Sequence, residues 1–513
     1  MTMNPAGVFQ RTERFLAVPA SRRTARIASP IRPEESVAIP QARGDDVAAA
    51  AARVREAQRE WAKRTVKERT AFAKRLHTLV LERQEDILDI IQWETGKSRR
   101  SAFDEVADVS MTALYYASNG PRQLASERRR GALPLLTTAR VNYHPRGLVS
   151  MISPWNYPFT LPMSDAIPAL IAGNGVLLKP DPKTTLSALY GISLMEEAGL
   201  PRDLFLTITG KAEVVGPALI AEGDYVMFTG STATGAKVAQ QAARHLIDFS
   251  AELGGKNAMV VLDDADQDRA IEGIITAAFS NAGQLCMSIE RLYVHEAIYD
   301  TFVPALVQRV SSLSLGIAMD YTADVGSLIS RDQLRKVNAH VQDAKKKGAT
   351  ILTGGRPRPD LGPFVYEPTV LEGVTEEMIV CRGETFGPVV AVTKISSDEE
   401  AIARANDSDY GLNASVWGSP ARATALATQI QAGSVNVNEG FTASWASTDA
   451  PMGGMKKSGI GRRHGPEGIR KYCETQTLAR QRLANVDAPK GMSQERFTRV
   501  MTAGLKMMRF IRR

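Results

Sequence analysis

One of only three cysteines in this 513-residue chain lies among small and polar residues, in the stretch SNAGQLCMS at 280–288. A cysteine in an apolar core usually has Val, Leu and Ile as neighbours and behaves there as a small hydrophobic side chain. Cys286 instead follows Gly283 and Gln284, and the small residues before it leave room for a ligand to approach. Because a thiolate is a strong nucleophile, Cys286 is a candidate catalytic group. A structural thiol is the alternative, and this stretch alone does not exclude it.

Two further motifs supply groups that nucleophilic attack on a carbonyl carbon requires. The stretch FSAELGGKN sets Glu252 before Leu253 and two glycines, where the backbone can approach the space that the carboxylate faces. Glu252 could act there as a general base, and an exposed salt bridge is the alternative. The stretch ISPWNYP sets Asn156 in a loop bounded by prolines after a predicted strand. Its amide N–H could donate to a developing oxyanion, although Asn is also common in ordinary turns.

Three other stretches could bind a dinucleotide. FTGSTATGAKVAQQAA follows a predicted strand and opens a helix, with Gly230 and Gly235 around the turn and Ser231 at the helix start. Free N–H groups at a helix start can bind a phosphate, but the spacing is not the usual G-x-G-x-x-G and a Ser-capped turn is the alternative. Lys179 ends a predicted strand in VLLKPDP, where it could reach ribose hydroxyls or phosphate, and a solvated lysine is the alternative. Glu384 precedes an aromatic residue and Gly-Pro in GETFGPVV, which could also be a turn.

The elements that must position these groups alternate between helix and strand. Residues 46–130 have apolar residues at intervals of three and four, which predicts long helices, and Gly96 is a plausible stop. From residue 138 the period changes to that of strands. Short apolar strands then alternate with helices, which predicts a parallel sheet with helices on both faces and a second α/β unit after residue 256. The predicted strands are GVLLKP, LFLTITG, YVMFTG, NAMVVLDDAD, RLYVHEAI, ATILTGG and PVVAVTKI.

Length and composition limit the class of protein. A chain of 513 residues predicts two or three domains, and no apolar run reaches the roughly 18 residues of a membrane span. Three cysteines cannot form a disulfide framework, which favours a reducing, cytoplasmic compartment. No basic and aromatic residues alternate on a strand pattern, so a nucleic-acid partner is not expected. No metal site is expected either.

Part of the net charge of +7 lies at the two ends of the chain. Residues 1–35 are rich in arginine and are predicted to form a solvated N-terminal arm, with an organelle transit peptide as the alternative. Residues 491–513 are predicted to form a basic amphipathic tail. Such a helix could make peripheral contact with an anionic membrane or pack on a partner subunit. The apolar residues of this tail with near-helical spacing are Phe497, Val500, Met501, Leu505, Met508 and Ile511.

Taken together, the motifs resemble the aldehyde dehydrogenase family over residues 36–480. The matching stretches, in chain order, are SPWNYP, LLKP, FTGS, ELGGK, NAGQLC, ETFGPV, GLNASVW and PMGGMKKSGIGRRHGPEG. Within the family, the chain is most similar to bacterial NADP-dependent succinate-semialdehyde dehydrogenases. The resemblance implies an NAD(P)-dependent oxidation of a small aldehyde to a carboxylic acid, through a cysteine thiohemiacetal and a thioester.

The resemblance also implies a role for each motif. Cys286 would be the nucleophile, Asn156 and the Cys286 backbone N–H would bind the oxyanion, and Glu252 would activate the water that hydrolyses the thioester. Lys179 would hold the adenosine ribose and Glu384 the nicotinamide ribose. The other cofactor-binding residues that it implies are Gly230 and Ser231 at the pyrophosphate, Phe386 beside the nicotinamide, and Trp155, Pro182, Lys183, Gly235, Leu253 and Gly254.

Two departures from the family pattern bear on specificity. NAD-preferring members usually place Glu three residues after the strand-end lysine, where this chain has Pro182 followed by Lys183. The missing carboxylate predicts NADP as the cofactor, with NAD possible. The two arginines that bind the substrate carboxylate in well-understood succinate-semialdehyde dehydrogenases are replaced here by Ser280 and Ser164. A neutral or aromatic aldehyde is therefore an alternative substrate, unless another group such as Arg291 supplies the charge.

The predicted architecture is an aldehyde dehydrogenase-like α/β fold with three parts. A Rossmann-type cofactor domain takes 1–130 and 147–255, an α/β catalytic domain takes 256–465, and a small β arm takes 131–146 and 466–490. The exposed strand edge of the arm predicts a homodimer or homotetramer. Two alternatives are a relative that transfers the acyl group to CoA, against which Glu252 argues, and a cofactor-free cysteine hydrolase, which does not explain Lys179. Arg463 stands where a Glu is common in the family, and the sequence suggests no role for it.

Overall fold

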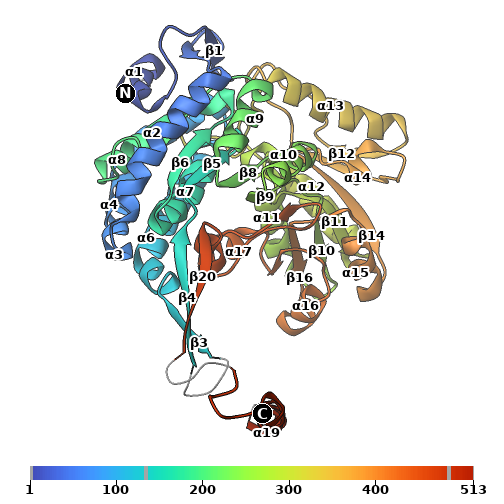
Figure 1. Ribbon diagram of the computed structural model, residues 1–513. Coiled ribbons are helices and arrows are strands. Elements are labelled where there is room, and N and C mark those ends of the chain that lie inside the picture. Colours follow the sequence, from blue (N-terminus) through green and yellow to red (C-terminus); the bar gives the residue numbers. More distant parts are fainter. Residues whose placement is uncertain (1–3, 132–136, 482–486, 512–513) are drawn as a thin grey trace. The chain divides into compact units, whose positions relative to one another are not determined.

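The computed structural model describes residues 4–131, 137–481 and 487–511, which group into two compact units (Figure 1). The first unit spans Met1–Gln123 and Pro145–Tyr472, and the second spans Leu124–His144 and Cys473–Arg513. All of the predicted site residues belong to the first unit.

A six-stranded sheet carries several of the predicted site residues at the carboxyl ends of its strands. Its order is β19-β9-β8-β5-β6-β7, with parallel pairing except for β19, which runs antiparallel to β9 at one edge. Lys179 ends β6, Gly230 follows β8, and Glu252 ends β9, so the three lie at the same edge of the sheet. The strands are β5 (Leu148–Ile152), β6 (Gly175–Lys179), β7 (Phe205–Thr207), β8 (Tyr225–Thr229), β9 (Asp248–Glu252) and β19 (Gly459–Ile460).

Helices cover both faces of this sheet because its strands are apolar on both sides. One face packs on α2 (Gly44–Ala62), α9 (Ala212–Glu222) and α10 (Thr232–Arg244), and α7 (Thr160–Ala172) and α8 (Thr185–Glu197) pack on its strands as well. Four more helices form a layer against α7 and α8. They are α3 (Val66–Arg69), α4 (Ala71–Glu82), α5 (Gln84–Thr95) and α6 (Arg99–Gln123). Gly96 ends α5 in a left-handed conformation with φ +72°, as the sequence predicts.

The N-terminal residues are not a solvated arm, so that prediction is wrong. They form α1 (Pro5–Thr12), the short 3₁₀ turn Glu13–Phe15 and a hairpin of β1 (Thr24–Ala28) and β2 (Ser36–Pro40). Phe15, Leu16 and Ile27 are buried, and Leu16 forms a parallel bridge with Thr207 beside β7. These few apolar residues are spaced too irregularly among the arginines to show a helix or strand period.

A second, seven-stranded sheet has the order β12-β13-β14-β11-β10-β16-β17, and only β12 is antiparallel to its neighbour. Its strands are β10 (Asn257–Val261), β11 (Ile289–His295), β12 (Thr350–Thr353), β13 (Thr369–Glu372), β14 (Val389–Ile395), β16 (Asn413–Trp417) and β17 (Ser434–Val437). One face packs on α11 (Gln267–Phe279), α12 (Glu296–Ser311) and α13 (Arg331–Lys346), and the other on α15 (Asp398–Asn406) and α16 (Pro420–Ala427). The short elements of this region are α14 (Ile379–Arg382), α17 (Thr442–Ala446), α18 (Gly465–Arg470), β15 (Tyr410–Gly411) and β18 (Met455–Lys456).

The second unit contains the predicted tail and most of the predicted arm. Residues 145–146 and 466–472, predicted for the arm, belong to the first unit, and residues 124–130, predicted for the cofactor domain, belong to the second. Its three-stranded sheet has the order β20-β4-β3, formed by β3 (Glu127–Arg130), β4 (Thr137–Pro145) and β20 (Cys473–Gln481). The tail forms α19 (Gln494–Ile511). Within the described ranges, no helix is both long enough and apolar enough to cross a membrane. Residues 132–136 and 482–486 of the predicted arm, residues 512–513 of the tail and the side chains of Met508 and Ile511 lie outside what the structure describes.

Candidate active site

Cys286 lies between two cavities of the first unit, and Asn156 and Leu161 line both of them with it. The smaller one, here named the apolar cavity, has a volume of about 40 Å³. It is lined otherwise by Tyr157, Thr160, Leu285, Met287, Phe441, Trp445, Met452 and Arg463. The larger one, here named the strand-end cavity, has a volume of about 190 Å³. It is lined otherwise by Pro154, Trp155, Thr229, Gly230, Ser231, Glu252, Leu253, Gly254, Gln333, Lys336, Glu384 and Phe386.

The backbone before Cys286 has an uncommon conformation. Asn281, Ala282 and Gly283 are consecutive residues with φ of 51°, 53° and 69°. A Cβ at Gly283 would lie 2.0 Å from the carbonyl oxygen of Gly387, so only glycine fits there. Gly283 therefore allows close backbone packing beside the cysteine.

The thiol of Cys286 is in an environment that disfavours its charged form. Burial and the nearby carboxylate of Glu252 raise the pKa of the thiol to about 12. The backbone of this loop is fixed by Asn257, whose Nδ2 donates to the carbonyl oxygens of Cys286 and Ser288, each at 2.8 Å. The sulfur is thus a positioned thiol at neutral pH and not a resting thiolate.

Glu252 lies at the boundary between ionised and neutral forms at physiological pH. Burial raises the pKa of its carboxyl group to about 7, and the opposing charges of Arg463 and Lys471 limit that rise. Its Oε1 is buried and has no hydrogen-bond partner among the described residues. A carboxyl group with this pKa and an open acceptor oxygen has the properties of a general base.

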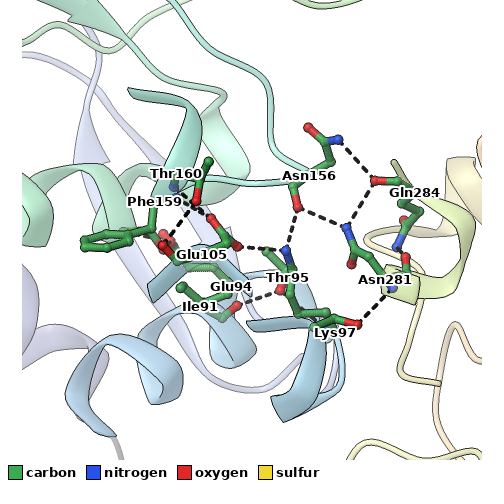
Figure 2. A network of polar contacts seen from close by, with 12 residues as sticks. Ile91, Glu94, Thr95, Lys97, Glu105, Asn156, Phe159, Thr160, Asn281 and Gln284 are labelled. Carbon is green, nitrogen blue, oxygen red and sulfur yellow. Dashed lines mark hydrogen bonds and ion pairs between the residues drawn. The ribbon is translucent and has the colours of Figure 1, made fainter. Parts of the chain in front are cut away.

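A buried network holds the loop that carries Asn156 (Figure 2). The carbonyl oxygen of Asn156 accepts from Lys97 Nζ at 2.7 Å and from Asn281 Nδ2 at 3.1 Å, and its own Nδ2 donates to Gln284 O at 3.1 Å. Lys97 Nζ also lies 2.7 Å from Glu105 Oε1, and both side chains are fully buried. The other oxygen of Glu105 accepts the backbone N–H groups of residues 159 and 160 at 2.8 and 3.0 Å. The network therefore joins the Asn156 loop to the cysteine loop.

The sequence reasoning missed Lys97, Glu105 and Asn281. Lys97 and Glu105 lie in the helical region 46–130, where they have the pattern of ordinary polar positions, and Asn281 lies five residues before Cys286 without a recognisable motif of its own. The only local signal is that Lys97 and Glu105 are eight residues apart around a helix start, which is too weak to predict a buried pair.

The start of α10 faces the strand-end cavity through Gly230 and Ser231. Ser231 is the N-cap, and its Oγ accepts the N–H of Thr234 at 3.4 Å. A Cβ at Gly235 would lie 2.4 Å from the side chain of Leu253, so this glycine lets α10 pack close to the end of β9. The sequence-predicted residues of this group are therefore brought together at one helix N-terminus.

Glu384 and Phe386 also line the strand-end cavity. Glu384 Oε1 accepts the N–H of Gly255 at 2.9 Å, and burial raises the pKa of Glu384 to about 7. Phe386 has a φ of 57° and makes an edge-on contact with the ring of Trp155 at a centroid distance of 5.5 Å.

The strained backbone at Phe386 is held by groups that the sequence reasoning also missed. The carboxylate of Glu290 accepts the N–H groups of Thr385 and Phe386 at 3.0 Å and forms a buried ion pair with Lys256. Gln333 donates to the carbonyl oxygen of Phe386 at 2.6 Å.

Lys179 and its neighbours at 182 and 183 are not among the residues that line the strand-end cavity. Lys179 is buried, its pKa is lowered by that burial, and its Nζ donates to Pro180 O at 3.4 Å. Pro182 begins the 3₁₀ turn Pro182–Thr184. Lys183 is about half exposed, and its Nζ lies 3.5 Å from Asp181 Oδ1.

The candidate groups for a substrate carboxylate are not available at the cavities. Arg291 donates to the carbonyl oxygens of Lys256 and Ala405 at 2.8 and 3.0 Å and lines neither cavity, so the suggestion that it could bind a substrate is wrong. Ser164 donates to Asp108 Oδ2 at 2.5 Å. In the described part of the chain, neither Ser164 nor Ser280 lines the two cavities.

Arg463, for which the sequence suggested no role, lines the apolar cavity with Cys286. Its guanidinium donates to both carboxylate oxygens of Asp165, at 3.0 and 2.6 Å, and to Thr229 Oγ1 at 2.6 Å. The only signal in the sequence was that this chain has arginine at a position where a Glu is common in the family.

Comparison with known proteins agrees with the geometry. The sequence profile described as the aldehyde dehydrogenase family matches residues 17–478. A protein of Mycolicibacterium smegmatis, provisionally named succinate-semialdehyde dehydrogenase (NADP+), is 52% identical over 469 residues, which cover 91% of each chain.

Solved structures are similar over most of the chain. Betaine aldehyde dehydrogenase of Staphylococcus aureus in complex with NAD+ is 30% identical with a TM-score of 0.87, covering 95% of this chain and 99% of that one. An NADP-dependent enzyme of E. coli is 32% identical with a TM-score of 0.85, covering 90% of this chain and 95% of that one.

Proposed function

Because the chain belongs to the aldehyde dehydrogenase family, we propose that it oxidises an aldehyde to a carboxylic acid with NADP through a thioester on Cys286. The observation that carries the proposal is the place of Cys286 between two cavities of different character. The apolar cavity receives the aldehyde, and the strand-end cavity receives the nicotinamide end of the cofactor. Asn156 lines both cavities and Glu252 lines the second, so three reacting groups lie within one site.

The residues present fit a dinucleotide. The N–H groups at the start of α10 beside Gly230 and Ser231 suit a pyrophosphate. Lys179 Nζ is buried with one long hydrogen bond among the described residues, which leaves donors for ribose hydroxyls. Glu384 Oε1 accepts the N–H of Gly255, and its other carboxylate oxygen could accept a hydrogen bond from the nicotinamide ribose. The bound cofactor would supply the hydride acceptor.

The chain's own groups supply the remaining chemistry. Cys286 Sγ bonds to the aldehyde carbon, and its proton passes through the neighbouring Glu252 carboxylate to solvent. Loss of hydride from that carbon to the bound cofactor would leave the thioester on Cys286. The Asn156 Nδ2 group has two N–H bonds, of which one donates to Gln284 O and the other is directed to the oxyanion. Glu252 then takes a proton from water, which attacks the thioester and releases the acid. Because Glu252 can activate water, we assign water rather than CoA as the acceptor of the acyl group from the thioester.

NADP is favoured over NAD by the residue at position 182. Proline there presents no carboxylate to repel a 2′-phosphate, and the ammonium group of Lys183 is nearby and half exposed. The cofactor named for the relative from Mycolicibacterium smegmatis is also NADP.

Succinate semialdehyde is the first candidate substrate, because the relatives at about 50% identity carry that name. A neutral or aromatic aldehyde is the second, and one specific observation favours it. The apolar cavity is lined by Tyr157, Phe441 and Trp445, and its one cation, Arg463, already pairs with Asp165. A free carboxylate would find no unpaired cation on that described lining.

The test is a matrix of aldehydes and cofactors measured on the purified protein. We expect oxidation with NADP to exceed that with NAD, and the ratio of succinate semialdehyde to benzaldehyde turnover decides between the two substrates. Cys286→Ser is the matched control and should lower turnover by at least about a thousandfold. Turnover near wild type in that variant, or acid formation without any nicotinamide, would refute the scheme.

Three further proposals concern the whole protein. The division into a cofactor domain, a catalytic domain and a β arm is supported by the two large sheets and the separate three-stranded sheet. Assembly into a dimer or tetramer is supported by the small sheet of the second unit, which has open edges at β3 and β20 among the described strands. A cytoplasmic location is supported by the low number of cysteines.

A further inference from the structure

A short hairpin folds over the end of β9, where Glu252 lies. Strand β19 pairs with β9 so that Gly459 lies opposite Glu252, and the N–H of Leu253 donates to Ser458 O at 2.9 Å. The backbone groups of Met452 and Arg463 pair with each other at 2.8 and 2.6 Å. The hairpin 452–463 is therefore fixed against Glu252 at one end and presents Arg463 at the other.

The side chain of Arg463 is fixed in turn by two residues. Asp165 on α7 accepts two hydrogen bonds from the guanidinium, and Thr229 accepts a third. Thr229 is the residue that lies opposite Glu252 in the register between β8 and β9. The bidentate bond to Asp165 thus holds the guanidinium beside the strand position of Glu252.

Arg463 is the cation with the largest effect on the pKa of Glu252. A second carboxylate, Asp165, and two further cations, Lys471 and Arg462, also act on Glu252, and Lys471 Nζ lies 3.9 Å from Asp165. Burial lowers the pKa of His464 to about 4, so that imidazole is neutral at pH 7. The charged and titratable groups that face this cluster are Arg462 and Arg463 after β19, Asp165 on α7, Lys471 after α18, His464, Tyr472 and the Cys286 thiol.

We propose that Arg463, held by Asp165 and Thr229, is a positioning residue that supplies the positive charge needed to keep the buried Glu252 carboxylate ionised for deacylation. Glu252 Oε1 has no hydrogen-bond partner among the described residues, so charge from neighbouring groups must offset its burial. The inference rests on the proposed function, since it assigns Glu252 to the hydrolysis of the Cys286 thioester.

The consequence has a definite sign. Arg463 lowers the pKa of Glu252, and Asp165 raises it. Replacing Arg463 by a neutral residue raises that pKa, so the active carboxylate appears only at higher pH. Replacing Asp165 by a neutral residue lowers the pKa, so the carboxylate persists to lower pH.

The test follows decay of the Cys286 acyl-enzyme, formed with p-nitrophenyl acetate, from pH 5.5 to 9.5 in the full-length protein. We expect wild-type deacylation to rise with an apparent pKa near 7. Arg463→Gln should move this limb upward by about one pH unit or more, which at pH 7 slows deacylation by about fivefold. Arg463→Lys should leave the apparent pKa of deacylation unchanged, and Asp165→Asn should lower it. The double variant Asp165→Asn/Arg463→Gln should return this apparent pKa toward the wild-type value.

Arg59→Gln removes an exposed arginine of α2 and is the matched control, with no shift expected. An unshifted limb in Arg463→Gln, or a uniform loss at every pH in both single variants, would overturn the inference. If Arg463→Gln does not fold, the direction of the shift in Asp165→Asn decides. Failure of the proposed function would appear differently, as a wild-type protein that acylates at Cys286 and oxidises no aldehyde.

Discussion

At the scale of single residues, Cys286 combines exact placement with low intrinsic reactivity. Its thiol is half-buried, and the Glu252 carboxylate beside it opposes formation of a second negative charge. A thiol protected in this way resists oxidation and alkylation when no substrate is bound. Glu252 therefore has two opposing effects on the same sulfur, since it can accept a proton and also disfavours the thiolate.

This opposition predicts the effect of Glu252→Gln on alkylation of the free protein. Removing the carboxylate charge lowers the pKa of Cys286, so iodoacetamide should modify the sulfur about tenfold faster at pH 8. The rate is measured by peptide mass spectrometry, which separates Cys286 from Cys381. Slower alkylation than in wild type would mean that Glu252 acts mainly as the base that ionises the thiol.

Asn156 provides a second prediction at this scale. Asn156→Ala removes the amide N–H that we assign to the oxyanion and should lower kcat by about 10²–10³-fold with little change in KM. Steady-state kinetics with the best aldehyde of the matrix measure this. Asn119→Ala, which removes an amide on α6 that bonds only to its own helix and to Arg122 among the described residues, is the control. A loss of less than tenfold in Asn156→Ala would contradict the assignment.

At the scale of elements, the reacting groups depend on a buried ion pair outside the site. Lys97, two residues before α6, donates to the carbonyl oxygen of Asn156, and Glu105 on α6 accepts the N–H groups of residues 159 and 160. The loop after β5 is thus set by a helix that contributes no residue to either cavity lining. This explains how one loop can hold the Asn156 amide, which we propose as the oxyanion donor, in a fixed position.

We therefore expect Lys97→Met to lower the free energy of unfolding by about 3–5 kcal/mol, because Glu105 is left buried without its cation. Urea denaturation measures the change. Lys63→Met, which breaks the exposed pair with Glu60, is the control and should cost about 1 kcal/mol or less. Equal losses in the two variants would show that the buried pair does not hold the loop.

The sequence predicted those elements whose signal is local. Strands β6, β8 and β10 are continuous apolar runs, and each occurs where the sequence predicts it. The hairpin of β1 and β2 was missed because its strands, TARIA and SVAIP, are only five residues long and neither keeps a regular alternation of apolar and polar residues over its whole length. The pairs Lys97–Glu105 and Arg463–Asp165 were missed for another reason: each needs a partner whose burial only the folded structure reveals.

At the scale of the whole molecule, the chain continues past the residues that the family profile matches. The family profile ends at residue 478, whereas α19 runs over Gln494–Ile511. On this helix Val500, Leu505 and Met507 are 57%, 60% and 63% exposed, among several basic residues. Apolar side chains next to basic ones on an exposed helix match the surface of an anionic membrane. We propose that the helix makes peripheral contact with such a surface.

Removal of residues 491–513 tests this proposal. The full-length protein should sediment with vesicles that contain anionic phosphatidylglycerol and remain in solution with neutral phosphatidylcholine vesicles, because the basic residues need a negative surface. The truncated protein should bind neither kind of vesicle and keep its aldehyde turnover, because the residues that line the two cavities all belong to the first unit. If truncation instead lowers the molecular mass of the assembly in light scattering and leaves vesicle binding unchanged, the helix packs on a partner subunit and the membrane proposal is wrong.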